Sequence, residues 1–168
     1  GVGGGGVFAA MYHAVNHSLS KGLLFLSAGR ILDAFHTKAI AEVHGIKHIL
    51  PRTALFWIAG FLAITGTPPF GTFVSEFLVA QYILTSGRLL LGVVYVLLLA
   101  VIFVGMVGPF IHMSYGTSPE RLGKKAHAES ILQMVPLTIL LLGVLIMGIA
   151  PPTRVLAVMQ QAAALFGG

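Results

Sequence analysis

The sequence predicts an all-α membrane protein, a multi-pass transmembrane bundle of about five helical spans. Of its 168 residues, 57% are hydrophobic and only 9% are charged, and the mean hydropathy is +0.94. A soluble domain has about 25% charged residues, and a disordered chain is polar and poor in aromatic residues. Ten Lys and Arg and five Asp and Glu side chains are too few to cover a soluble core of this size. Both of those classes are therefore excluded.

Charge and cysteine content narrow the class further. The net charge is +5, and the basic residues are scattered between apolar runs, which fits cytoplasmic loops and lipid head groups better than a nucleic-acid surface. The chain has no cysteine, which excludes disulfides, cysteine-ligated zinc and cysteine-ligated iron–sulfur clusters. The glycine-rich start, GVGGGG, has no strand before it and does not predict a dinucleotide loop. We therefore expect no cofactor, no metal and no nucleic acid, and we expect another chain to carry any electrons.

The first expected span covers about residues 7–31. Its second half is apolar, whereas its first half carries histidine, asparagine, serine and lysine side chains. Such a helix suits the inside of a bundle better than a lipid-facing position.

A polar linker over 32–52 follows, with three histidines and mixed charges. We expect a short amphipathic surface helix in this linker, ending before Pro51.

Two further segments flank a proline pair. The second expected span covers 49–66 and stops at Pro68 and Pro69, because proline cannot continue a helix. The third covers 70–86, about 15 to 17 residues or roughly 25 Å of helix, and carries Glu76. Short segments interrupted by glycine and proline are typical of discontinuous helices in transporters. We therefore expect a discontinuous helix in this region.

The rest of the chain adds two spans and a terminal helix. The fourth expected span covers 88–113, with a break at Pro109, and a polar loop follows over 116–130. The fifth covers 131–150 and is closed by a second proline pair. The tail, 153–166, has apolar residues at helical spacing. This spacing predicts a C-terminal amphipathic helix on the membrane surface or against a neighbouring subunit.

The basic residues in the loops indicate an orientation. With five spans, six of them share one side of the membrane: Arg30, Lys38, Lys47, Arg52, Arg88 and Arg154. Three share the other side: Arg121, Lys124 and Lys125. Because cytoplasmic loops are enriched in Lys and Arg, this count favours the first side as cytoplasmic.

Three polar residues of the first span form a row. His13, His17 and Lys21 are spaced i, i+4 and i+8, so they point to nearly one side of a helix in steps of about 6 Å. Lys21 lies near the middle of its span, where a charge costs at least about 2.5 kcal/mol. We interpret the row as a proton relay linked by water. The alternatives are a permanent ion pair for Lys21 and neutral histidines that hydrogen-bond between helices. Two histidines without a third ligand do not predict a metal site.

Glu76 is the only acid within an expected apolar span. We interpret it as a terminal proton carrier that faces a hydrated half-channel. The alternative is a packing or capping role near a helix start, where a carboxylate meets the positive end of the dipole. The candidate relay residues are therefore His13, His17, Lys21 and Glu76, and we expect no catalytic residue in this chain.

Two motifs carry a family resemblance. The segments MYHAVNHSLSKGLLFLSAG (11–29) and LAITGTPPFGTFVSEFLVAQ (62–81) resemble the proton-translocating, antiporter-like membrane subunits. That family includes the pumping subunits of respiratory complex I, Mrp cation/proton antiporters and the F component of hydrogenase-4, and the NHSLSKGLLF wording is most similar to the hydrogenase-4 branch. The chain begins with Gly1, and the resemblance covers essentially all of it as the C-terminal third of a larger subunit. We therefore expect a fragment that forms a single membrane domain.

The resemblance implies a function and a setting. It places the row of His13, His17 and Lys21 on a central hydrophilic helix and Glu76 on a discontinuous helix. It implies a proton-translocating subunit in the inner cell membrane, with membrane and peripheral subunits of a hydrogenase or complex I-like assembly as partners and protons, or Na⁺, as the transported ion. It also implies that the 116–130 loop is cytoplasmic, whereas the count of basic residues puts this loop on the other side of the membrane. For the side of this loop we follow the resemblance. A subunit of an Mrp-type Na⁺/proton antiporter and a structural membrane scaffold stay open as alternatives.

Overall fold

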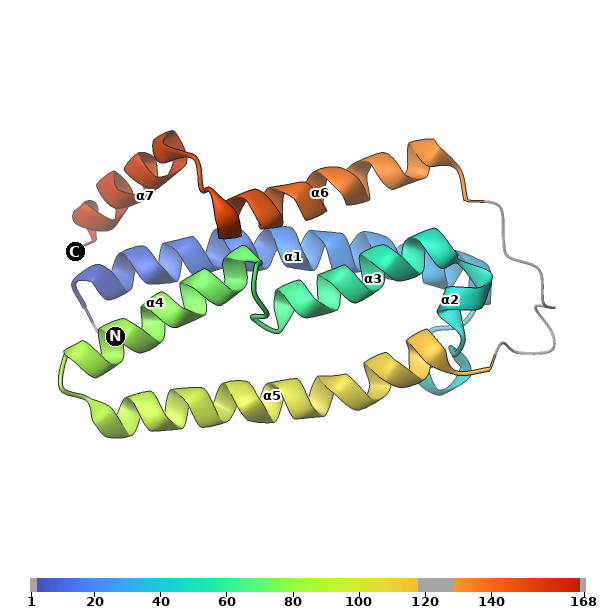
Figure 1. The fold of residues 1–168 in the computed structure, drawn as a ribbon, viewed down its shortest axis with the longest axis horizontal. Helices are drawn as coiled ribbons and strands as arrows, with labels where there is room; N and C mark the ends of the chain where they lie inside the picture. The colour runs from blue at the N-terminus through green and yellow to red at the C-terminus, as the bar shows by residue number, and fades with distance from the viewer. Residues whose placement is uncertain (1–2, 118–128, 167–168) are drawn as a thin grey trace.

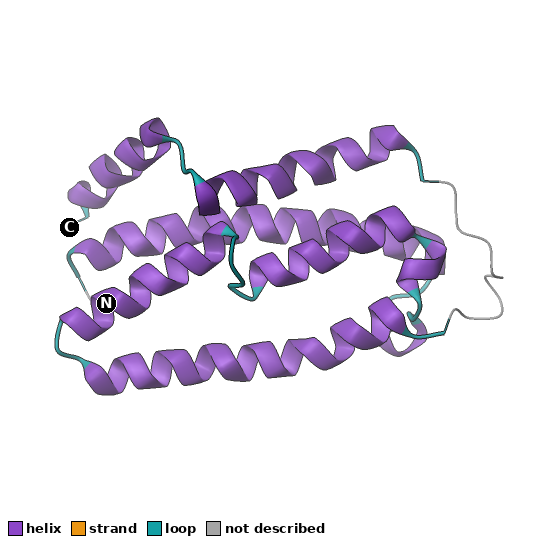
Figure 2. Cartoon of the chain, in the orientation of Figure 1, coloured by secondary structure: helices purple, strands orange, loops and turns teal. Residues whose placement is uncertain are grey.

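The computed structural model describes residues 3–117 and 129–166, and within them the chain is helical with no strand (Figures 1 and 2). The all-α class predicted from composition is therefore confirmed. The elements are α1 (Gly5–Phe35), η1 (Ile40–Glu42), α2 (Ile46–Ile49), α3 (Pro51–Ile64), α4 (Gly71–Thr85), α5 (Leu89–Tyr115), α6 (Ile131–Ile149) and α7 (Thr153–Leu165).

Length and hydropathy identify the membrane-crossing helices only in part. Among the described residues, α5 and α6 are both long and apolar enough to cross a bilayer, and α3 is a shorter apolar helix. Helix α1 is the longest, with 31 residues, but its polar side chains lower its hydropathy. It is also central, since α3, α4, α6 and α7 all pack against it. A central position for this polar helix is the arrangement that the first span predicts.

Helices α3 and α4 lie end to end along α1 (Figure 1). From residue 53 to residue 82, the residue numbers of the contacted positions on α1 decrease steadily. In order, the pairs are Thr53 with Arg30, Gly60 with Leu24, Ser75 with His13, and Tyr82 with Gly5. The two short helices are therefore the halves of one interrupted span, antiparallel to α1, with the break at residues 65–70.

This arrangement corrects one expectation and supports another. Segments 49–66 and 70–86 were predicted as two separate spans, whereas the structure uses them as one, so the described chain runs along the bundle four times, as α1, α3 with α4, α5 and α6. The discontinuous helix expected at Pro68 and Pro69 is present. A proline pair ends a helix but leaves the direction of the next segment undetermined, so hydropathy shows the break without showing whether the chain turns back.

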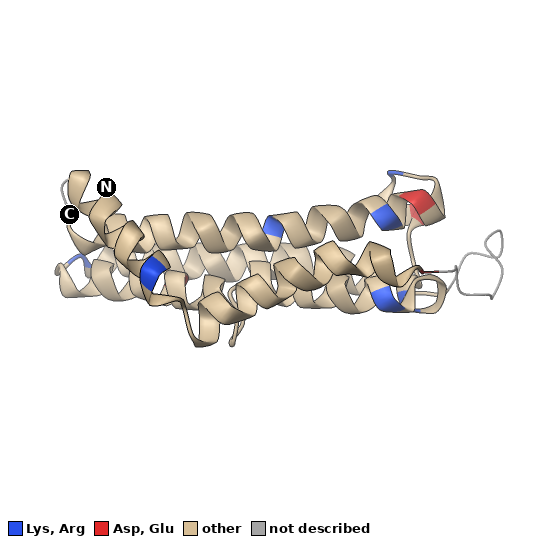
Figure 3. Cartoon of the chain, turned by 90° about the horizontal axis from the view of Figure 1, so that it is seen from above, with Lys and Arg blue, Asp and Glu red and all other residues tan. Residues whose placement is uncertain are grey.

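The path of the chain also changes how the basic residues are grouped. Residues 36–50, the end of α5 and the start of α6 lie at one end of the bundle (Figure 1). Arg88 precedes α5 at the opposite end, and Arg154 belongs to α7, which lies toward that end. Most charged positions in Figure 3 lie near the two ends.

The basic residues therefore divide differently from the six-to-three count. Arg30, Lys38, Lys47 and Arg52 are at the α2 end of the bundle, and Arg88 and Arg154 are not. Arg121, Lys124 and Lys125, the other group of that count, lie outside the described residues. Among the described basic residues of this count, four lie at the α2 end and two do not, so the positive-inside rule still predicts the α2 end as the cytoplasmic side.

The expected C-terminal helix is present as α7. It packs against the first half of α1, and its Met159 joins Tyr12 and Met147 in a buried apolar cluster. Helix α6 reaches the break between α3 and α4 at Gly148, where an added Cβ would overlap the carbonyl oxygen of Pro69 and lie 2.7 Å from the carbonyl carbon of Phe70. Backbone therefore meets backbone at this point, which requires a residue without a side chain.

Candidate functional site

A cavity of about 530 Å³ lies between α1, α4 and α5, beside the break in the interrupted span. Helix α5 packs on α3 through Phe61 and Phe110, whose ring centroids are 4.0 Å apart, and on α4 where Gly92 meets Leu84. The cavity lies between these two contacts. Its lining residues are Ala10, His13, His17, Lys21, Ile64, Thr65, Glu76, Val79, Tyr95, Leu99, Ile102, Phe103 and Met106.

All four predicted relay residues line this one cavity. His13, His17 and Lys21 reach it from one side of α1, as their spacing predicts, and Glu76 reaches it from α4. The imidazole centroids of His13 and His17 are 5.4 Å apart and the rings are tilted by 34°. Lys21 Nζ lies 5.7 Å from the ring centroid of Phe25, and no carboxylate of residues 3–117 or 129–166 pairs with it. A permanent ion pair for Lys21 is thus not found in the described chain.

Glu76 rests against the backbone at the break. Gly66 follows α3 with φ +65°, and a Cβ on it would overlap Glu76 Oε2 and lie 2.8 Å from Glu76 Cδ. Only glycine adopts this backbone conformation without strain and leaves room for the carboxylate. Helix α4 begins at Gly71 and has no acid in its first turn. The capping alternative for Glu76 is therefore not supported, because the dipole effect is confined to the first turn.

Two polar residues of the site were not identified from the sequence. His13 Nδ1 lies 2.9 Å from Ser75 Oγ, and Ser75 is fully buried. Tyr95 lines the cavity from α5. The sequence could have indicated Tyr95, because it is the only polar side chain between residues 89 and 111. Ser75 had no comparable signal, since serine is common inside helix bundles.

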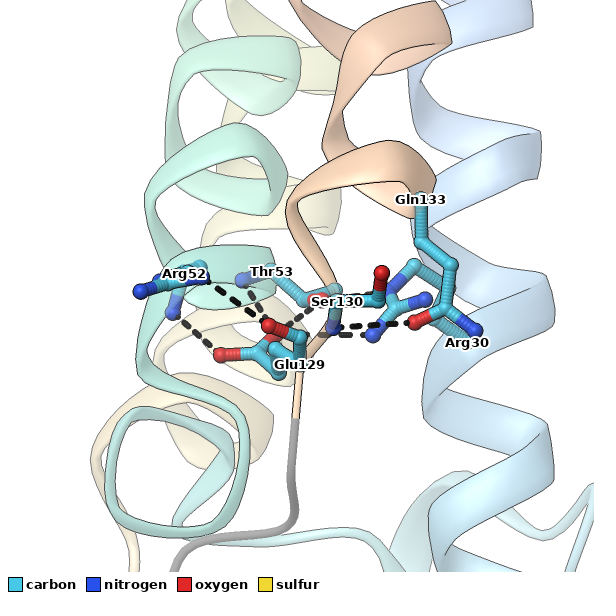
Figure 4. Close-up of polar contacts among 6 residues, drawn as sticks. All are labelled: Arg30, Arg52, Thr53, Glu129, Ser130 and Gln133. Carbon is cyan, nitrogen blue, oxygen red and sulfur yellow. Dashed lines mark hydrogen bonds and ion pairs between the residues drawn. The ribbon is translucent and has the colours of Figure 1, made fainter.

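A second polar cluster joins three helices at the α2 end (Figure 4). Glu129 Oε2 accepts the backbone N–H of Arg52 at 2.7 Å, and Oε1 accepts the backbone N–H and hydroxyl of Thr53 at 2.8 and 2.5 Å. Arg30 Nη2 is 3.8 Å from Glu129 Oε1, and the glutamate side chain is only 3% exposed. The carboxylate thus neutralises the N-terminus of α3 and ties the start of α6 to α1.

Metal binding has no support from the described residues, because they contain no group of three or more His, Asp or Glu side chains that could hold an ion. The site instead combines a carboxylate, two imidazoles, an amine and the hydroxyls of Thr65 and Tyr95 around one cavity, with the Ser75 hydroxyl hydrogen-bonded to His13. These are groups that exchange protons, directly or through water.

Residues 1–103 match the family described as NADH:quinone oxidoreductase/Mrp antiporter, transmembrane. The chain belongs to this family. The resemblance inferred from the two motifs is therefore confirmed, and the chain is a membrane domain of the NADH:quinone oxidoreductase/Mrp antiporter type.

Named relatives come from two branches of this family. The chain is 34% identical to hydrogenase-4 component B of Escherichia coli over 141 residues, and this match covers 80% of the chain and 21% of that protein. It is 29% identical to Na⁺/H⁺ antiporter subunit A1 of Staphylococcus epidermidis over 168 residues, and this match covers 94% of the chain and 21% of that protein. The subunit A1 of Staphylococcus aureus is 29% identical over 154 residues, covering 85% of the chain and 19% of that protein. The chain thus spans about a fifth of the length of these relatives.

Proposed function

We propose that this domain of the antiporter-like family carries a proton relay through His13, His17, Lys21 and Glu76. The observation that carries the proposal is that all four side chains, separated by up to 63 positions in the sequence, line one cavity beside a broken span. In lipid, irregular backbone is tolerated where it is enclosed by protein or lines a hydrated space. Broken helices in transporters form their ion sites at such breaks.

The relay has an order set by the helices. Glu76 lies at the break and faces Tyr95 across the cavity, and we assign to it the exchange of protons with water entering beside α5. His13 contacts α4 through Ser75, and His17 and Lys21 follow it along α1 in steps of about 6 Å. Single waters in the cavity would bridge these steps. A proton would pass from Glu76 to His13 and His17 and reach Lys21, each group returning to its starting state once the proton has moved on.

Lys21 is the end of the relay within this chain. Its side chain is exposed in the described structure, so it is available to a neighbouring segment or subunit. An exposed ammonium within a membrane helix is costly unless protein or water covers it. The whole protein would therefore supply the continuation of the path beyond Lys21.

For the whole protein, we propose a proton-translocating subunit of an energy-converting oxidoreductase complex in the inner cell membrane. The relative named hydrogenase-4 component B supports a hydrogenase-like assembly. In this proposal, other membrane and peripheral subunits carry out the redox chemistry, and their charge changes drive protons through the relay. The chain would form a single membrane domain of the larger subunit.

A second candidate function is favoured by a different relative. The similarity to Na⁺/H⁺ antiporter subunit A1 extends over 94% of the chain, so the domain would equally serve an Mrp-type antiporter. The two functions share the proton relay and differ in whether proton movement is coupled to electron transfer or to Na⁺. A structural scaffold, the third alternative, would require none of the four polar residues.

The test uses the full-length subunit in its complex, reconstituted in lipid vesicles with a pH-sensitive dye. We expect Lys21→Met and Glu76→Gln each to lower proton transport by roughly 100-fold, while Lys38→Met, the same change outside the cavity, leaves it unaltered. Transport driven by an electron donor would identify the oxidoreductase function, and transport driven by a Na⁺ gradient the antiporter. Undiminished transport in both cavity variants would refute the relay and leave the scaffold.

A further inference from the structure

We propose that Ser75 is a positioning residue that holds His13 as its Nδ1–H tautomer and so makes Nε2 the only ring atom that gains and loses a proton. This inference rests on the proposed relay and adds to it a residue that touches no transported ion. Ser75 is fully buried in the second turn of α4, and its hydroxyl joins α4 to α1.

The hydroxyl of Ser75 has a single proton to donate. Ser75 Oγ lies 2.7 Å from the carbonyl oxygen of Thr72 and 2.9 Å from His13 Nδ1. A carbonyl oxygen can only accept a hydrogen bond, so the hydroxyl proton must lie between Ser75 Oγ and Thr72. If it pointed at the imidazole instead, two oxygen lone pairs would face each other at 2.7 Å inside the protein.

Because the hydroxyl of Ser75 donates its proton to the carbonyl of Thr72, Ser75 Oγ can only accept a hydrogen bond from His13. A hydroxyl oxygen keeps two acceptor lone pairs, and one of them meets His13 Nδ1. Nδ1 must therefore carry a hydrogen, and in the neutral imidazole Nε2 is then bare. When the ring takes up a second proton, Nδ1–H stays on Ser75, and only Nε2 changes.

This assignment constrains the path of the proton. His13 cannot take a proton at one nitrogen and release it at the other without breaking its bond to Ser75. Both exchanges must pass through Nε2 and the cavity, where the titratable neighbours are His17 and Lys21 from α1, Glu76 from α4 and Tyr95 from α5. The buried hydroxyl thus keeps His13 from passing protons toward the interface of α1 and α4.

The experiment measures the tautomer directly. The full-length subunit, labelled with ¹⁵N-histidine and embedded in lipid, gives separate solid-state NMR shifts for protonated and bare ring nitrogens, and a His13→Gln sample assigns the signal. We expect neutral His13 to show a protonated Nδ1 and a bare Nε2. In Ser75→Ala the Nε2–H form should appear and proton transport should fall, and Ser75→Thr, which restores a hydroxyl, should recover both.

Ser27→Ala is the matched control. Ser27 is a fully buried serine whose hydroxyl also donates to a backbone carbonyl, that of Leu23 at 2.8 Å, but it has no hydrogen bond to a histidine. Its removal should leave the His13 spectrum unchanged. A protonated Nε2 in the neutral wild-type ring, or an unchanged tautomer in Ser75→Ala, would overturn the assignment.

The readouts separate this inference from the function on which it rests. The tautomer is read without transport, so undiminished transport in Lys21→Met and Glu76→Gln can refute the relay while the NMR spectrum still supports the position that Ser75 gives to the His13 proton. If Ser75→Ala does not fold, the wild-type spectrum alone decides.

Discussion

Gly66→Ala tests whether the position of the Glu76 carboxylate matters. Gly66 has φ +65°, and an added Cβ would overlap Glu76 Oε2 and lie 2.8 Å from Glu76 Cδ. Ordinary contact begins at 3.4 Å, so the carboxylate must retreat from the break into the cavity. We expect the variant to be less stable than the wild type and to transport protons poorly.

Two separate terms make up the expected loss. An alanine with a left-handed backbone costs about 1–2 kcal/mol. The steric overlap adds about 1–3 kcal/mol if the surroundings are forced to repack, and less if the glutamate swings away. For transport, a misplacement of about 1 Å at a reacting group can cost on the order of 100-fold, so a loss of at least roughly tenfold is expected.

Gly87→Ala supplies the control for the backbone term. Gly87 follows α4 with φ +75°, and nothing lies within 4 Å of its added Cβ. It therefore carries the same backbone strain without touching Glu76. The difference between the two variants isolates the displacement of the carboxylate.

The assay combines thermal unfolding of the purified full-length subunit with dye-monitored proton transport in vesicles. We expect Gly87→Ala to lose stability alone, and Gly66→Ala to lose stability and transport. If both variants lose the same stability and both transport protons at the wild-type rate, the location of Glu76 at the break has no functional importance, and our account of the site is wrong.

Two other substitutions test the packing. Gly148→Ala should destabilise the subunit by about 1–3 kcal/mol because its Cβ meets the backbone of the break. The control is Gly105→Ala, which has open space around it and should be neutral or stabilising by up to about 1 kcal/mol. Equal melting temperatures of the two variants would contradict the close packing of α6 on the break. Glu129→Gln should cost about 1.5–3 kcal/mol because it removes a buried charge that accepts three hydrogen bonds, and Asp33→Asn, on an exposed side chain, should change the free energy of unfolding by less than about 0.5 kcal/mol. A Glu129→Gln protein as stable as Asp33→Asn in a denaturation series would refute the three-helix link.

Much of the site could be predicted because it depends on helical periodicity. The row of His13, His17 and Lys21 is a local property of one helix, so its common side follows from 3.6 residues per turn. Glu76 stood out because acids are rare in apolar spans. Ser75 did not stand out, since its importance comes from a bond to a helix that is 62 positions away in the sequence.

Glu129 is a second residue whose role could not be predicted from the sequence. In the sequence it belongs to a polar loop, where a glutamate is ordinarily solvated. In the structure its side chain is only 3% exposed and lies beside the first turn of α3 and Arg30. Its role depends on where a distant helix begins, which no local pattern encodes.

The sequence by itself determined that this is a helical membrane domain with a broken span and a row of protonatable side chains on one helix. Composition, periodicity and proline positions are sufficient for these features because each depends on residues close together in the chain. Only the tertiary structure decided that α3 and α4 continue in one direction and that Glu76 and the row share a cavity. The reason is that proline interrupts the helical hydrogen bonds without choosing the path beyond them, and that path is selected by packing against α1, α5 and α6.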